Sequence, residues 1–399
     1  MELADLRSHL HRGGAATLNH PATYAVAEGA VIAPARYAGS RGSGSRGSQF
    51  VHETRWVDGT FATTVLVDSK QSQSNRAEEG LITSRREGGA ARRIPVISVS
   101  YSRRTLLDLE LPHRAFDAHI RAATHNGESV VAQSWYRELR DATLADLSPV
   151  FTASPATIAF GGWDSSRKAG QLRLRGLFVS ELFGVTADAD AATPTSVSKR
   201  SGARLDPLGQ QIRLSPDDYE RLLEAQRDQL SEKTIKKIEG EIAKARKSKK
   251  AEMIPAASLV LGGIPPATDT PFGVSVPEVR RARTYSLAGL RRLRFGGSAE
   301  DDVAARTALL AMMLLGAAYA DADPEIRAYC DVSTPSGQTF LDDEVVELDL
   351  SIESCERFLE EAIDGLPERL AWDGQVIELV GDPALDRGAV DEGADADDA

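Results

Sequence analysis

The chain is poor in the residues that build metal sites and disulfide frameworks. Its 399 residues include two cysteines, Cys330 and Cys355, at a spacing that fits neither kind of site. All seven histidines lie at or before His125, and none is followed four residues later by another, so the helical pair of a zinc hydrolase is missing. We therefore expect no metal and no cofactor, and the scarcity of cysteine predicts a reducing, cytoplasmic environment.

Targeting and membrane segments are also scarce. The N-terminus has no basic segment followed by an apolar run, so secretion is not expected. Residues 303–320 are apolar, but Arg306 and small polar residues interrupt them, which predicts a buried core helix and no membrane partner. A hydrophobic content of 42% is enough for a packed core, and we expect one large domain with insertions over residues 1–380.

Basic charge is low overall and concentrated locally. The net charge is −12, and residues 381–399 contribute half of it through seven acids and one arginine. We expect that segment to be a disordered tail. Residues 36–104 hold twelve basic and six acidic residues, and residues 280–294 hold six arginines and no acid. An acidic protein with such basic regions can still bind phosphates.

A polar helix start follows a buried strand. Residues 61–68, FATTVLVD, predict the strand, and Ser69 or Ser72 can cap the helix after it. Amides of the first turn and the helix dipole favour an anion there. The polar and cationic residues of this turn predict contacts to phosphate or ribose: Lys70, Gln71, Ser72, Gln73, Ser74, Asn75 and Arg76. A purely structural role for the turn is the alternative.

Residues 154–187 read as two strands joined by a basic turn. Residues 157–163 are β-branched and aromatic, and residues 171–179 alternate leucine with arginine, as in a strand with unlike faces. The cationic and aromatic side chains of this hairpin predict binding to a nucleic-acid backbone and a base: Trp163, Arg167, Lys168, Arg173 and Arg175. The alternative is an ordinary solvated hairpin.

Other segments predict a mixture of helices and strands, an α+β fold. A strand is expected at 94–101. A helix is expected from residue 109, with Pro112 in its first turn. His113 and Arg114 would then lie at the helix start, and we count them among the candidate nucleic-acid contacts. Further predicted elements are a flexible glycine- and serine-rich loop at 37–48, helices at 134–147, 216–252 (a helical insertion at about 214–254), 301–319 and 353–363, and a strand at 283–295.

Three segments together resemble a known family. VLVDSKQSQSNRAEEGL, LELPHRAFDAHI and SPATIAFGGWDSS with LRGLFVSELFGV, in this order, are similar to the crRNA-binding backbone subunit of the type I-G (formerly I-U) CRISPR surveillance complex, Cascade. This subunit has the Cas-seven role within the RAMP superfamily, and the resemblance spans roughly residues 25–335. It implies an RRM-like, ferredoxin-like RAMP palm with long insertions and a protruding thumb hairpin. Residues 154–187 are either that thumb or a pair of palm strands.

The resemblance also implies partners and a non-catalytic role in antiviral defence. Copies of the subunit would assemble head to tail along one crRNA, and residues 70–76 would hold its phosphates. The bases then stay free to pair with target DNA. Other expected partners are the large subunit and a Cas-five or Cas-six type subunit of Cascade.

Two other classes of function stay open. A RAMP-type endoribonuclease that cuts target RNA would use an acidic residue, and Asp68 and Asp164 are the candidates. Neither has acids or histidines beside it in sequence that would position a metal or accept a proton. An RNA-free structural oligomer is the second alternative.

Overall fold

A computed structural model describes residues 1–38, 48–167, 170–186, 197–199, 213–247, 253–259 and 271–388. By its internal contacts the chain divides into two units, residues 1–198 with 273–389 and residues 199–272 with 390–399. Helices and strands are both abundant and are distributed over several sheets, so the predicted α+β class is confirmed.

The first unit is built on a nine-stranded antiparallel sheet. Its main path runs β21-β20-β1-β18-β13-β6-β5, while β2 pairs with β18 and with β19. Its long strands are β6 (Thr60–Asp68), β13 (Phe178–Val185), β18 (Glu278–Ser286) and β5 (His52–Val57). Its short strands are β1 (Thr17–Asn19), β2 (Ala22–Ala25), β19 (Ser336–Gly337), β20 (Thr339–Leu341) and β21 (Glu344–Val346).

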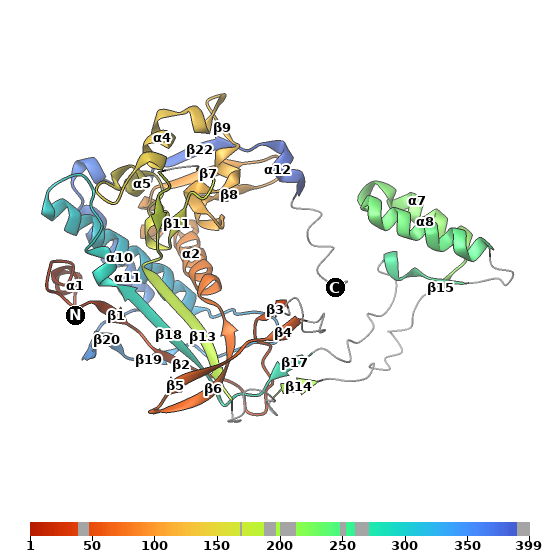
Figure 1. Ribbon diagram of the computed structural model, residues 1–399, viewed down its shortest axis with the longest axis horizontal. Helices are drawn as coiled ribbons and strands as arrows, with labels where there is room; N and C mark the ends of the chain where they lie inside the picture. Colours follow the sequence, from red (N-terminus) through yellow and green to blue (C-terminus); the bar gives the residue numbers. More distant parts are fainter. Residues whose placement is uncertain are drawn as a thin grey trace. The chain divides into compact units, whose positions relative to one another are not determined.

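Three helices supply much of the core of this unit. α2 (Lys70–Glu87) follows β6 directly and packs on β13 and on α10 (Ala299–Ala322), which packs in turn on α11 (Ile352–Asp364) (Figure 1). Glycines let α2 and α10 approach closely, because a Cβ added to Gly80 would lie 2.4 Å from the carbonyl oxygen of Gly316. α10 is long and apolar enough to cross a membrane, but it is mostly buried inside the protein, as predicted for a core helix.

A second sheet belongs to the same unit. Its five strands run β10-β9-β22-β7-β8, with β22 (Val376–Val380) parallel to β7 (Val96–Ser100), so the strand predicted at 94–101 is confirmed. The other strands of this sheet are β8 (Thr105–Leu107), β9 (Thr124–His125) and β10 (Glu128–Ser129). Two-stranded pairs are β3 (Arg36–Ala38) with β4 (Ser48–Phe50), β11 (Gly162–Trp163) with β12 (Arg173–Leu174), and β14 (Val197–Lys199) with β17 (Pro271–Val274).

Short helices connect these strands. The α-helical ones are α1 (Leu3–Ser8), α3 (Ala118–Arg121), α4 (Ser134–Asp141), α5 (Ser148–Ala153), α6 (Pro155–Ala159), α9 (Leu287–Leu290) and α12 (Pro383–Gly388). The 3-10 turns are η1 (Ala90–Arg93), η2 (Asp108–Glu110), η3 (Arg114–Phe116), η4 (Val130–Ala132) and η8 (Glu368–Leu370).

The second unit contains a helical hairpin. Its elements are β15 (Arg213–Leu214), α7 (Pro216–Gln226), η6 (Arg227–Gln229), α8 (Glu232–Lys247), β16 (Ile254–Pro255) and η7 (Ala256–Leu259). The single helix predicted at 216–252 is therefore wrong. The turn allows the apolar side chains of α7, such as Tyr219 and Leu223, to pack against Ile238 and Ile242 of α8. One continuous helix would leave both stripes in water.

Two further predicted elements are wrong in the first unit. Residues 157–159 belong to α6 and not to a strand, because Pro155 occupies the first helical turn, where its missing amide hydrogen is not needed. The helix predicted from residue 109 is broken into η2, η3 and α3. Arg114 has a φ of 47°, which a right-handed helix does not accommodate.

Other predicted boundaries differ from the observed ones. α4 ends at Asp141 although the helix was predicted to reach 147, and the strand predicted at 283–295 ends at Ser286, after which α9 begins. In the predicted loop at 37–48, residues 39–47 lie outside the described residues. In the predicted tail at 381–399, Pro383–Gly388 form α12, and the residues from 389 onward lie outside the described part.

We predict that Asp108 makes the stability of the first unit depend on pH. Its carboxylate is fully buried, accepts from the Ile97 amide (3.3 Å) and from the Ser154 hydroxyl, and has its pKa raised by burial to about 6. Between pH 4 and 6 the Asp108 carboxyl therefore stays more protonated in the native protein than in the unfolded chain, so its contribution to the free energy of unfolding falls as pH rises, by on the order of 3 kcal/mol.

Urea unfolding of the wild-type protein and of Asp108→Asn at pH 4, 5, 6 and 7 measures this effect. The amide of the variant does not titrate, so the variant should lose the part of the decline that Asp108 causes. Parallel declines in both proteins would contradict the assignment.

Candidate nucleic-acid interface

Five of the residues that were predicted as nucleic-acid contacts lie together in the first unit. They line a cavity of about 630 Å³ and are His113, Arg114, Trp163, Arg173 and Arg175. Arg292, from the segment after α9, lines the same cavity. We call this cavity the groove. Its lining residues come from η3 and the loop before it, from α6, from the β11–β12 pair, and from α9 and the segment after it, so segments far apart in the sequence meet here.

The groove is positively charged. Its lining residues, all within the described part of the chain, include no aspartate or glutamate. Arg175 donates to the Ser286 hydroxyl (2.6 Å), and Arg292 is exposed and has no side-chain partner among the described residues. Together with Arg173, these guanidinium groups leave three positive charges that no carboxylate of the described residues neutralises. The planar guanidinium group presents paired N–H donors that match the oxygens of a phosphate.

The β11–β12 pair presents an aromatic ring at the rim of the groove. Trp163 lies opposite Arg173 in the antiparallel register, and the guanidinium carbon of Arg173 is 5.0 Å from the centre of the ring. The indole nitrogen donates to Gln171 (3.0 Å), which fixes the ring while 46% of Trp163 stays exposed. The predicted alternation is confirmed, because Arg173 and Arg175 are exposed and Leu174 is buried. An exposed, oriented ring is suited to stacking with a base.

Arg114 forms the floor of the groove. It is buried, and its guanidinium makes two bonds to Glu78 of α2 (2.5 and 2.6 Å) and one to the carbonyl oxygen of Gly161 (2.9 Å). Burial, the larger effect, raises the pKa of Glu78 to about 7, and Arg114 opposes that rise. Glu78 and the Gly161 carbonyl group occupy the donors of Arg114. Arg114 therefore has a structural role in the groove and is not a contact for phosphate. His113 beside it is exposed at the rim.

The tip of the predicted hairpin does not extend freely at Arg167. The guanidinium of Arg167 pairs with Asp141 (2.7 Å) at the end of α4 and donates to the carbonyl oxygen of Arg140 (2.5 Å). Among the described residues the two arms pair with each other at Gly162–Trp163 and Arg173–Leu174, while Phe178–Val185 form β13 of the nine-stranded sheet. Lys168 lies outside the described residues.

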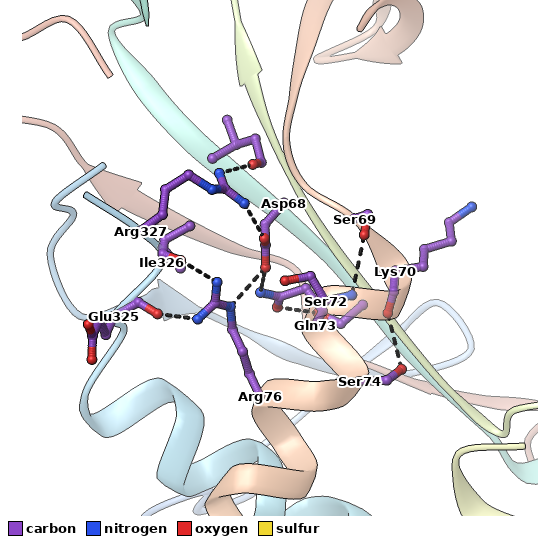
Figure 2. Close-up of polar contacts among 12 residues, drawn as sticks. Asp68, Ser69, Lys70, Ser72, Gln73, Ser74, Arg76, Glu325, Ile326 and Arg327 are labelled. Atoms are coloured by element: carbon purple, nitrogen blue, oxygen red, sulfur yellow. Dashed lines mark hydrogen bonds and ion pairs between the residues drawn. The ribbon is translucent and has the colours of Figure 1, made fainter. Parts of the chain in front are cut away.

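The predicted polar helix start is a separate feature of the first unit. Residues 70–76 begin α2, and the hydroxyl of Ser69 accepts from the Ser72 amide (3.3 Å), as predicted for an N-cap. None of these residues lines the groove. Figure 2 shows that the centre of this region is Asp68, the last residue of β6.

Asp68 is fully buried and holds three donors. Its oxygens accept from Arg76 Nε (2.9 Å), from Arg327 (2.7 Å) and from the Gln73 amide (2.7 Å) (Figure 2). Arg76 also donates to the carbonyl oxygens of Glu325 and Ile326. Gln73 and Arg76 therefore stabilise the fold. In the sequence, the sign of this structural cluster is Asp68 itself, an acid at the end of a buried strand.

The other residues of this helix start stay accessible. Gln71 and Asn75 are exposed, Ser72 and Ser74 are partly exposed, and Ser74 donates to the Lys70 carbonyl oxygen (3.1 Å). Lys70 points away from the Asp68 cluster in Figure 2, and its ammonium lies 3.8 Å from the carboxylate of Glu181.

The two acids that were candidates for cutting RNA, Asp68 and Asp164, are buried. The Asp68 carboxylate is bonded to Arg76, Arg327 and Gln73. Asp164 is 1% exposed and is bonded to Arg140 (2.7 Å) and to Ser166 (2.7 Å). Among the described residues no group of three or more His, Cys, Asp or Glu side chains is placed to hold a metal ion. Both cysteines are buried and free, and burial raises the pKa of Cys330 to about 11 and of Cys355 to about 12.

Comparison with known families places this geometry in a biological context. Residues 18–189 match the family model described as CRISPR-associated protein GSU0053. The chain is thus similar to a CRISPR-associated family. This agrees with the CRISPR association expected from its motifs, and the matched region contains α2, Arg114 and the β11–β12 pair. No curated protein matches the chain.

We predict that Asp68 is needed for stability. Asp68→Asn removes the negative charge that two partly buried arginines share, and the free energy of unfolding should fall by about 3 kcal/mol. Asp58→Asn is the matched control, because Asp58 is exposed and pairs with Arg280 at the surface, so its loss should change stability by less than about 1 kcal/mol. Equal effects of the two substitutions in urea unfolding would show that the Asp68 cluster is not structural.

Proposed function

We propose that this protein is a non-catalytic, crRNA-binding backbone subunit of a type I-G CRISPR surveillance complex. One observation carries the proposal: the groove combines three arginines that no acid neutralises with an exposed tryptophan. Phosphates bind to the former and a base can stack on the latter, and neither contact reads the edges of bases. The similarity to a CRISPR-associated family supplies the context.

The remaining expectations belong to the same proposal. Copies of the protein assemble head to tail along the guide in the cytoplasm, beside the large subunit and a Cas-five or Cas-six type subunit, and the guide pairs with target DNA. Exposed side chains at the start of α2 are a second candidate contact, supported by the accessibility of Lys70, Gln71 and Asn75. A protein that holds every guide needs contacts that ignore sequence.

The endoribonuclease alternative has less support. Its two candidate acids, Asp68 and Asp164, are buried and engaged by arginines, so neither is accessible to an RNA ribose or to water. An RNA-free oligomer would have no use for an acid-free arginine groove. Incubation of the purified protein with labelled guide RNA distinguishes the three cases. Protection without cutting supports our proposal, shortened products support the enzyme, and no complex supports the oligomer.

We predict that Arg173→Ala combined with Arg292→Ala weakens binding of every guide alike. Each arginine neutralises about one phosphate, so the slope of log affinity against log salt should become less steep by about 1.4. Arg92→Ala with Arg103→Ala is the matched control, because both arginines are exposed, lie outside the groove and have no side-chain partner among the described residues. Unequal losses among guides of different spacer sequence would contradict backbone recognition.

We predict a different signature for Trp163. Trp163→Ala should weaken guide binding by about tenfold or more, because one stacked base contributes about 1–3 kcal/mol, while the salt slope should stay unchanged. Trp163→Phe keeps an aromatic face and should retain most of the affinity. Fluorescence anisotropy at several salt concentrations measures both quantities. Affinity that is the same for all three proteins would exclude stacking on this ring.

A further inference from the structure

A second cationic cavity shares a segment of the chain with the groove. It has a volume of about 740 Å³ and is lined by side chains from the segment after α1, from the segment after α9 and from the first half of α10: His11, Arg12, Arg291, Arg294, Asp302 and Arg306. We call it the arginine cavity. The segment 291–294 contributes to both cavities, since Arg292 and Leu293 line the groove while Arg291 and Arg294 line the arginine cavity.

The arginine cavity carries more positive charge than it neutralises. Four guanidinium groups line it and Asp302 is the one carboxylate among its lining residues, all of which the structure describes. The Asp302 carboxylate lies 3.3 Å from Arg306 and 3.4 Å from Arg294. Arg12 is exposed and has no side-chain partner among the described residues. An excess of this size attracts an anion.

Backbone carbonyl groups hold the arginines in place without neutralising them. Arg291 donates to the carbonyl oxygens of His9 (2.8 Å) and Ala15 (2.6 Å), and Arg306 donates to that of Leu293 (2.7 Å). A carbonyl oxygen fixes the direction of a guanidinium but brings no negative charge. Burial, the largest effect, lowers the pKa of Arg306, and the charges of Arg294 and Arg291 add to this while Asp302 opposes it.

We propose that the arginine cavity binds a phosphate of the same RNA strand that the groove holds, so that the strand crosses the segment 291–294. This inference rests on the proposed function. The segment shared by the two cavities gives continuity between them. An acidic peptide fits less well, because Val303 and Ala299 are the apolar side chains that line the cavity, which offers little surface to a peptide.

The test compares Arg12→Ala/Arg294→Ala with the wild-type protein on single-stranded RNAs of about 4 to about 20 nucleotides. Short RNAs that fill the groove alone should bind both proteins equally. On longer RNAs the variant should bind more weakly than the wild type, with a salt slope less steep by about 1.4. Arg12→Lys/Arg294→Lys keeps the charge and should restore the slope, and Arg92→Ala/Arg103→Ala is the control for loss of two surface arginines.

Three outcomes would overturn the inference, and they are distinguishable. If the wild type binds RNA and Arg12→Ala/Arg294→Ala keeps the same affinity and slope at every length, the arginine cavity is not on the RNA path, while the proposed function stands. If the wild type binds no RNA of any length, the proposed function fails and the inference fails with it. If the variant loses affinity for poly-glutamate and not for RNA, the cavity belongs to an acidic protein partner. Arg12→Ala alone breaks no bond within the described protein and repeats the test without risk to the fold.

Discussion

The buried pair of Arg114 and Glu78 is the contact on which the groove depends. It joins the start of η3 to α2, and the bond from Arg114 to the Gly161 carbonyl oxygen extends the tie to the start of β11. A buried guanidinium is tolerated when its charge is matched and its donors are occupied. Because Arg114 meets both conditions inside the protein, the floor of the groove is formed without a ligand, and the arginines above it keep their charge.

Arginines in this protein divide into those that hold the fold and those that face solvent-accessible cavities. In the basic stretch 280–294, Arg281 and Arg283 are buried against Asp321, whereas Arg292 is exposed in the groove. The same division appears at the start of α2, where Arg76 is bonded to Asp68 and Lys70 is exposed. Local charge alone therefore does not identify a binding surface. In these two stretches the arginines that hold the fold, Arg76, Arg281 and Arg283, each contact a carboxylate that the tertiary fold brings to them, whereas Arg292 contacts none among the described residues.

Sequence patterns predicted the elements with strong local signals. The buried strand β6, its capped successor α2 and the apolar α10 were all expected, since a continuous apolar run and an N-cap serine are local features. Of the strand expected at 157–163 the structure has Gly162–Trp163, while 157–159 are helical after Pro155, and the helix expected from 109 was wrong because the positive φ of Arg114 interrupts it. Residue types suggested Trp163, Arg173 and His113, but their convergence arises from contacts between distant segments.

In our proposal the groove, with its arginines and its exposed tryptophan, lies against an RNA strand. The most direct measurement is photo-crosslinking of the purified particle assembled on 4-thiouridine-labelled guide RNA, with the crosslinked peptides identified by mass spectrometry. We expect crosslinks in the peptides that contain Trp163 and residues 173–175. A particle that contains no nucleic acid, or crosslinks that fall entirely outside the groove, would contradict it.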